Sequence, residues 1–315
     1  DFQALPMHVV DGVGDVLGCV REPLPRRWKA LSMAEDIGPG ETNYNKYDRQ
    51  VASEAVKWLK DTTNTREPWV LFVSLVAPHF PLIAPPKFYE LYENLQLMPS
   101  KPKPEPEHPW HEAMRNCQLM DNFTPEKTEI ALKSYYALVS FIDELIGNIL
   151  KTLKSLELEE STQIIYTSDH GDNIGERNLW GKSNFYEESI GIPLIIAGPN
   201  VPIGKVCQTP VSLVDIYPTI LETAKLSVEP QKPGRSLSKI ANEPDENDRM
   251  IFAEYHAMGS KSGGFMIRKG RWKYVHYVGM RAQLFDLESD PEEMSDLGES
   301  HEFSDITQEL EGELR

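Results

Sequence analysis

A carboxylate and an imidazole stand side by side at the end of an apolar run, as Asp169 and His170 of the string TQIIYTSDHGD. The run is typical of a buried parallel strand, and open α/β sheets bind ligands at the carboxyl ends of such strands. A carboxylate oxygen beside a neutral imidazole nitrogen can bind a divalent metal ion. The backbone must turn at His170 for the two side chains to converge, and Gly171 permits such a turn. A helix N-cap aspartate beside a surface histidine is the alternative.

Two further residues could belong to the same site. Lys182, in the string WGKSN, follows on the next loop and can bind the anion that the metal also binds. His79 stands at the end of a second apolar run, residues 69–76, where the carboxyl end of a strand faces the crevice of an α/β sheet. A solvated lysine and a structural histidine are the ordinary alternatives.

The C-terminal part of the chain offers weaker candidates. His256 ends a short apolar run and could contact a substrate from a small second domain. Basic and aromatic residues alternate nearby, where Arg271 and Lys273 flank Trp272. A solvated sheet edge, whose charges discourage aggregation, is the expected explanation for that basic cluster.

The positioning elements follow from periodicity and from proline. Residues 47–60 carry apolar residues at helical spacing, and residues 69–76 are typical of a strand buried on both faces. Thr124 and Pro125 provide the N-cap and first turn of a long helix whose apolar stripe includes Val139 and leads into the strand before Asp169. A proline-rich string at residues 99–109 predicts a stiff, exposed loop.

Further along, a strand over residues 193–197 and a helix over residues 212–222 complete an α/β pattern. After residue 228 the sequence pattern changes to short β-prone runs separated by glycine and charged residues, which predict a small antiparallel sheet. These runs are 250–255, 265–268, 272–278 and 283–287. We therefore expect an α/β domain over residues 1–228, which is N-terminally incomplete, and a small C-terminal subdomain over residues 229–315.

Composition limits the classes of protein. The chain has 315 residues, 40% of them hydrophobic, and a formal net charge of −17. Such a charge would repel a nucleic acid, although an acidic protein can still bind an anion at a locally positive site. No apolar stretch approaches the ~20 residues that cross a bilayer. Three scattered cysteines, Cys19, Cys117 and Cys207, do not form a disulfide framework.

Taken together, these strings resemble the sulfatases of the alkaline phosphatase superfamily. Residues 166–199 are similar to the segment that holds the family's second group of metal ligands, and residues 73–92 to the segment that carries its leaving-group histidine. Residues 265–277 and 283–297 are similar to later family segments, and the string EYHAMGS at 254–260 resembles the choline-sulfatase and phosphonate-monoester-hydrolase branch. The resemblance implies an alkaline-phosphatase-like mixed sheet sandwiched by helices.

The resemblance also implies a role for each candidate. Asp169 and His170 would bind a divalent cation, Ca²⁺ or Mn²⁺, and Lys182 would hold a sulfate oxygen. His79 would protonate the departing alcohol and contact the substrate, and His256 would contribute a substrate contact. The reaction implied is hydrolysis of a sulfate monoester of a small molecule or carbohydrate.

One departure from the family limits these expectations. The family's nucleophile is a formylglycine made within a C-x-P-x-R motif, and none of the three cysteines lies in one. The chain therefore resembles a C-terminal portion of a sulfatase that carries half a site. We expect this half-site to bind metal weakly, and the isolated chain to hydrolyse no aryl sulfate.

Alternatives stay open at this point. A phosphonate or phosphodiester hydrolase, a non-catalytic protein of the same fold, and a two-chain enzyme each fit the sequence. The alcohol, the metal, a homo-oligomeric state and a cytoplasmic or exported location are not decided by these residues. The first residue is not methionine, which suggests a fragment or a processed product.

Overall fold

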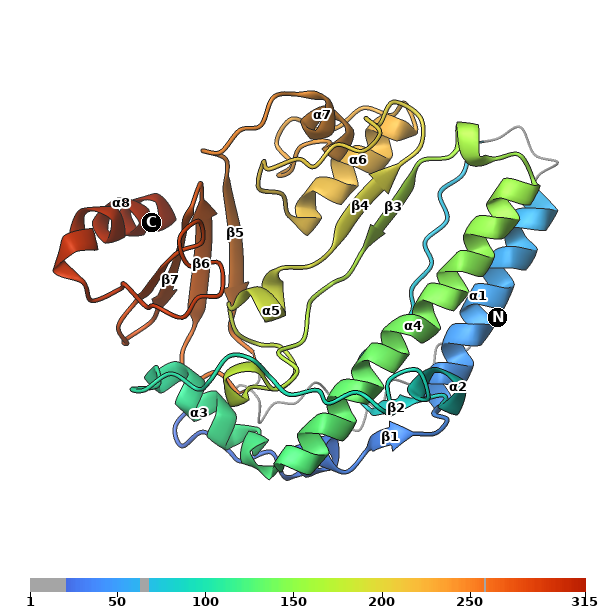
Figure 1. Cartoon of the computed structure of the whole chain (residues 1–315). Coiled ribbons are helices and arrows are strands. Elements are labelled where there is room, and N and C mark those ends of the chain that lie inside the picture. The colour runs from blue at the N-terminus through green and yellow to red at the C-terminus, as the bar shows by residue number, and fades with distance from the viewer. Residues whose placement is uncertain (1–20, 63–67, 258) are drawn as a thin grey trace. The chain divides into compact units, whose positions relative to one another are not determined.

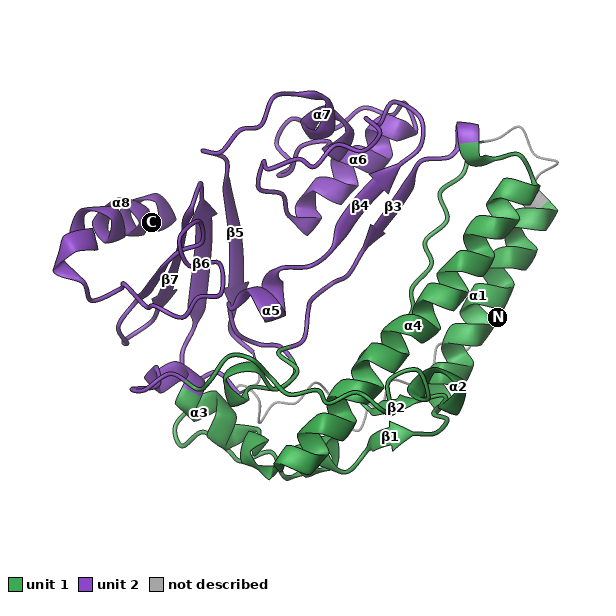
Figure 2. Ribbon diagram, viewed as in Figure 1, with its two compact units in different colours: residues 1–103, 112–159, 173–181 green, residues 104–111, 160–172, 182–315 purple. Residues whose placement is uncertain are grey.

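The computed structural model describes residues 21–62, 68–257 and 259–315. The chain forms two compact units (Figure 2). Unit 1 comprises residues 1–103, 112–159 and 173–181, and unit 2 comprises residues 104–111, 160–172 and 182–315. Each unit gathers segments that are distant in the sequence. The division into domains at residue 228 stays a prediction.

Two long helices run side by side in unit 1 (Figure 1). Helix α1, Asn43–Thr62, confirms the helix predicted over residues 47–60. Helix α4 spans Pro125–Ser155. Beside them, β1, Ile37–Pro39, pairs in parallel with β2, Leu82–Ala84, and the short helix α2 follows at Pro86–Tyr89.

Helix α4 begins where the sequence predicts. The Thr124 hydroxyl accepts the backbone N–H of Lys127 at 3.3 Å, and a proline occupies the first turn, where an N–H lacks an intrahelical partner anyway. The predicted apolar stripe is only partly buried, because Val139 is 39% exposed whereas Ala131 and Leu138 are buried. The prediction gave weight to large side chains, but small alanines let helices approach closely and so share the buried face.

The prediction of a buried strand over residues 69–76 is wrong. This segment runs extended but joins no strand in the described part of the chain. Its side chains alternate in exposure, and Val70 and Phe72 are 60% and 87% exposed. A β-strand needs a neighbour that shares its ladder of hydrogen bonds, and none of the described segments supplies one here.

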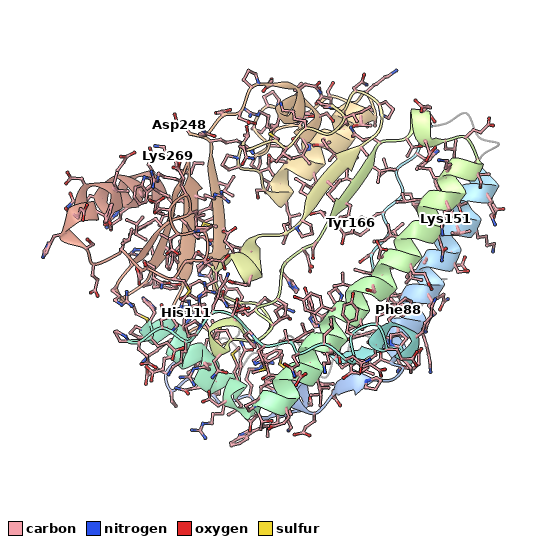
Figure 3. All side chains as sticks on the ribbon, in the orientation of Figure 1. Phe88, His111, Lys151, Tyr166, Asp248 and Lys269 are labelled. Atoms are coloured by element: carbon pink, nitrogen blue, oxygen red, sulfur yellow. The ribbon has the colours of Figure 1, made fainter. Side chains whose placement is uncertain are left out.

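Unit 2 contains a two-stranded sheet that leads to the candidate site. Strand β3, Ile164–Thr167, pairs with β4, Leu194–Ala197, and the pairing is antiparallel, so the predicted parallel, buried strand is wrong among the described residues. Tyr166, labelled in Figure 3, is 36% exposed. The side chain of Gln163 ties the start of β3 to two helices, because it bonds to residues of both α6, Ile216–Thr223, and α7, Leu237–Asn242.

The C-terminal sheet confirms the prediction almost residue by residue. Its four antiparallel strands follow in the order β5, Met250–Tyr255; β6, Gly264–Lys269; β7, Trp272–Tyr277; and β8, Gln283–Asp286. Helix α8, Ser304–Leu314, was not predicted, and its Leu310 joins Ile267, Tyr274 and Leu284 in a buried apolar cluster. The chain thus mixes helices and sheets and ends in a small antiparallel sheet.

The remaining elements are short. Helix α3, Pro109–Cys117, begins in unit 2 and ends in unit 1, and helix α5, Glu187–Ile190, belongs to unit 2. Short 3-10 segments lie at Trp28–Ala34, Met120–Asn122, Glu159–Ser161, Glu176–Asn178, Leu213–Asp215 and His301–Phe303. In the portion of the chain described here, every helix is too short or too polar to span a membrane.

Candidate metal and anion site

Asp169 and His170 lie on a tight turn that follows β3. The Ser168 hydroxyl donates to the backbone oxygen of His170 at 2.8 Å, and the His170 N–H donates to the Asp169 carboxylate at 3.0 Å. Before the turn, the Thr167 hydroxyl donates to the carbonyl of Pro193 at 2.9 Å, which holds the end of β3 against the start of β4. These bonds bring two successive side chains together, although successive side chains of a strand point apart.

The hydrogen bonds of His170 fix which ring nitrogen can bind a metal. Its Nδ1 lies 2.8 Å from the carbonyl oxygen of Gly171, and a carbonyl only accepts, so Nδ1 carries the hydrogen in the neutral ring. The lone pair is then on Nε2, which lies 3.6 Å from an oxygen of the Asp169 carboxylate. A metal ion or a proton between this nitrogen and the carboxylate would satisfy both acceptors.

This geometry fits a divalent metal. Metal–ligand bonds of about 2.0–2.6 Å can reach Nε2 and the carboxylate oxygen from one point, since 3.6 Å is less than two such bonds. The Asp169 side chain is 83% exposed and the His170 side chain 30% exposed, so both are open to an ion. Within the residues that the structure describes, no group of three or more His, Cys, Asp or Glu side chains could hold a metal.

Lys182 interacts electrostatically with the carboxylate of Asp169. Burial lowers the pKa of Lys182, and the carboxylates of Asp172 and Asp169 act in the opposite direction by raising it. A lysine that is partly removed from water binds an anion more strongly than a solvated lysine does, because water no longer screens its charge. The structure therefore brings Asp169, His170 and Lys182 together in unit 2.

Gly171 serves a purpose other than the predicted backbone turn. Its φ does not fall in the left-handed region, but a Cβ at this position would lie 2.0 Å from the carbonyl oxygen of Glu188. Its N–H donates to the carbonyl of Ser189 at 2.8 Å. Glycine is therefore required because helix α5 closely approaches the turn that carries Asp169 and His170.

One charged residue near this site was missed by the sequence analysis. Lys273 was assigned to a solvated sheet edge, but its side chain is fully buried and pairs with Glu187 and Glu293. The strand pattern gave no signal, because a buried partner carboxylate lies far away in the sequence. Lys269, a basic residue of β6 labelled in Figure 3, behaves as expected of a surface and pairs with Glu309 and Glu313.

His79 belongs to unit 1, so its place beside the other candidates stays a prediction. The backbone around it is held by Asp48 of α1, whose buried carboxylate accepts the N–H groups of Val76 and Ala77 at 2.7 and 2.9 Å. Burial raises the pKa of Asp48, and these two hydrogen bonds act against that rise. His79 Nδ1 donates to the carbonyl of Phe80 at 2.7 Å, so Nδ1 carries the hydrogen in the neutral ring.

His256 follows strand β5 in unit 2. Its Nε2 lies 3.0 Å from the Glu254 carboxylate, and its ring meets the ring of Phe265 edge to face at 4.8 Å. An imidazole held by a carboxylate and an aromatic ring has a defined orientation, as a substrate contact needs. That role stays a prediction.

Comparison with known proteins gives a consistent result. A family model described as Sulfatase matches residues 24–226, and a second, described as N-sulphoglucosamine sulphohydrolase, C-terminal, matches residues 175–315. A choline-sulfatase of Rhizobium meliloti is 36% identical over 272 residues, which cover 82% of this chain and 53% of that protein. Mouse arylsulfatase K is 30% identical over 298 residues, with 85% and 53% covered.

The chain spans about half the length of the curated relatives it matches. Solved structures share its fold at lower identity. A protein solved in complex with its substrate D-glucosamine-2-N,6-O-disulfate has a TM-score of 0.72 at 21% identity, covering 85% of this chain and 68% of that one. A phosphonate monoester hydrolase from Silicibacter pomeroyi has a TM-score of 0.72 at 22% identity, with 83% and 57% covered.

Proposed function

Because the chain belongs to the sulfatase family, we propose that it carries the metal- and anion-binding half of a site that hydrolyses sulfate monoesters. The observation that supports this most is the convergence of Asp169, His170 and Lys182 in unit 2, with His170 Nε2 3.6 Å from the Asp169 carboxylate. A carboxylate and an imidazole suit a divalent cation, and the neighbouring ammonium suits the anion that such a cation attracts.

In this proposal Asp169 and the Nε2 atom of His170 hold Ca²⁺ or Mn²⁺. The bound cation would neutralise negative charge on the sulfate group and on the attacking oxygen. The hydrogen bond from His170 Nδ1 to the carbonyl of Gly171 would keep Nε2 turned towards the metal position. An imidazole ligand favours Mn²⁺ more than a purely oxygen-ligated site would.

Lys182 would bind a sulfate oxygen. Charge accumulates on the sulfuryl oxygens and on the leaving oxygen as the ester bond breaks, and a partly buried ammonium stabilises that charge without reorganisation of water. The nearby carboxylates of Asp169 and Asp172 favour the charged form of this lysine, which the task requires.

His79 and His256 would act on the alcohol side of the ester. His79 can deliver a proton from Nε2 to the departing oxygen, because its Nδ1 is engaged by the carbonyl of Phe80. His256, oriented by Glu254, would contact the substrate. Neither residue identifies the alcohol, so the substrate class we propose is a sulfate monoester of a small molecule or carbohydrate.

The nucleophile of the reaction is not among these 315 residues, since no C-x-P-x-R motif for formylglycine occurs in them. We therefore expect the isolated chain to bind metal and sulfate weakly and to hydrolyse no aryl sulfate. Metal-dependent release of the phenol above the buffer rate would contradict this expectation.

The activity itself is tested by expressing the complete reading frame that contains these residues. We expect hydrolysis of an aryl sulfate that exceeds hydrolysis of a phosphonate monoester, and a loss of about 100-fold or more in kcat for Lys182→Met. Lys205→Met, which changes an exposed lysine of unit 2, is the matched control and should retain activity. A higher rate on the phosphonate ester would instead assign the protein to the hydrolases of phosphonates.

A further inference from the structure

The ammonium group of Lys273 makes three short contacts inside unit 2. It donates to the carbonyl oxygen of Phe185 at 2.8 Å and forms ion pairs with Glu187 at 2.7 Å and Glu293 at 2.5 Å. The side chains of Lys273 and Glu293 are 0% and 1% exposed. Strand β7 thus holds a charged group against the segment that follows Lys182.

Glu293 also binds the segment that follows Lys182 directly. One oxygen of its carboxylate accepts the backbone N–H of Glu187 at 2.7 Å, in addition to the ion pair with Lys273. Helix α5 therefore begins at a residue whose backbone and side chain are both held by groups that come from the C-terminal sheet and the loop after it.

Helix α5 also contacts the turn that carries Asp169 and His170. Gly171 donates its N–H to the carbonyl of Ser189 at 2.8 Å and approaches the carbonyl of Glu188 too closely for any side chain. Helix α5 thus contacts both the turn that carries His170 and the buried charged residues Lys273 and Glu293. A displacement of α5 would move His170 and Lys182 together.

Stability alone does not explain this arrangement. Burying an ammonium and a carboxylate carries a desolvation penalty, and an apolar pair of similar volume is often as stable or more stable. Lys273 and Glu293 bind both backbone and side-chain groups at the start of α5. Because such hydrogen bonds are directional, they fix the position of that helix. We propose that Lys273 and Glu293 are positioning residues, which hold α5 so that His170 and Lys182 face the metal and the anion; this rests on the proposed function.

The test uses the 315-residue chain and two readouts that require no turnover. The first is the exchange rate of the Gly171 amide, which reports how well α5 is held. The second is the broadening of the His170 ring signals in NMR spectra by Mn²⁺, which detects weak metal binding. The variant Lys273→Met/Glu293→Gln removes both buried charges but keeps an acceptor for the Glu187 N–H.

The control is Lys269→Met/Glu313→Gln, which makes the same changes of residue type in a partly exposed ion pair between β6 and α8 of the same unit. In the Lys273→Met/Glu293→Gln variant we expect the Gly171 amide to exchange about 10-fold faster. We also expect about 10-fold more Mn²⁺ for the same broadening of His170. The control should change neither value by more than about twofold.

The outcomes separate the two proposals. If the natural chain shows no selective broadening at His170, the metal site is wrong, and the Gly171 exchange rate alone decides the positioning role. If the variant folds and both readouts stay within about twofold of the natural chain, positioning is overturned. If the double variant does not fold, the single variant Glu293→Ala is used in its place. Glu293→Ala leaves Lys273 paired with Glu187 but removes the acceptor of the Glu187 N–H. An unchanged Gly171 exchange rate in this variant would equally overturn the proposal.

Discussion

Gly171 faces the backbone oxygen of Glu188 so closely that a Cβ built on Gly171 would lie 2.0 Å from it. No side chain other than hydrogen fits at this distance without moving one of the two backbones. The turn that carries Asp169 and His170 and the short helix α5 are therefore in direct contact, and that contact can be tested with a single methyl group.

We predict that Gly171→Ala lowers the free energy of unfolding by about 1–3 kcal/mol, since the added methyl group overpacks the contact. It should also weaken the response of His170 to Mn²⁺. Gly147→Ala is a suitable control, because a Cβ there meets nothing within 4 Å and alanine favours the helix α4. Equal stability of the two variants in urea unfolding would show that the close approach is absent.

The second prediction concerns Asp48, whose two carboxylate oxygens each accept one backbone N–H before His79. In Asp48→Asn the amide nitrogen cannot accept, so either Val76 or Ala77 loses its partner. We expect a loss of about 1–3 kcal/mol in unfolding free energy and a shift of the His79 ring resonances. Asp143→Asn, which changes an exposed carboxylate of helix α4, should leave both unchanged.

The third prediction is a pH dependence that arises from His108. Burial lowers the pKa of His108 from 6.5 to about 4. The ring accepts the N–H of Trp110 at 3.2 Å and contacts the carbonyl of Arg281 at 3.1 Å, so the neutral form suits both contacts. The folded state binds the proton less well than the unfolded state does. The contribution of His108 to stability is therefore fully present above pH 6.5 and lost as the pH falls towards 4.

That loss amounts to roughly 3 kcal/mol once the pH is below both pKa values. His108→Gln cannot titrate, so its unfolding free energy should fall less steeply between pH 6.5 and 4 than that of the natural chain. Urea unfolding at a series of pH values measures both slopes. Parallel slopes would exclude His108 as the source, and the exposed His301→Gln serves as the control.

The fourth prediction addresses the start of helix α4. Thr124→Ala removes the side-chain acceptor for the N–H of Lys127 and should lower the unfolding free energy by about 1 kcal/mol. Thr124→Ser keeps the hydroxyl and should restore most of that loss. If the alanine and serine variants unfold at the same urea concentration, the cap contributes nothing measurable.

These features differ in how far the sequence could predict them. The strands β5 to β8 were predicted because each is bounded by glycine, proline or charge and pairs with its neighbour in the chain. The state of residues 69–76 was not, because an apolar run indicates a tendency to form a strand and cannot supply the strand's partner. The antiparallel pairing of β3 was missed for a similar reason, since an apolar run does not show in which direction its partner β4 runs.

The candidate site shows the same division. Asp169, His170 and Lys182 could be proposed from the sequence because they are close in it and their residue types indicate the chemistry; their roles stay predictions. The role of Gly171 was misjudged, because a close approach of two backbones depends on tertiary structure that no local pattern records. Lys273 was misassigned for the same reason, since its acidic partner Glu293 is recognisable only once the loop after β8 is in place.

The contacts of Lys273 and Glu293 with helix α5 have a consequence for the choice of a minimal fragment. A protein ended at residue 228 would retain Asp169, His170 and Lys182, yet it would lack the ammonium and the carboxylate that grip Glu187. The residues proposed to bind metal and anion and the residues proposed to position them are thus encoded about a hundred positions apart. Truncation by sequence alone would keep the former and discard the latter.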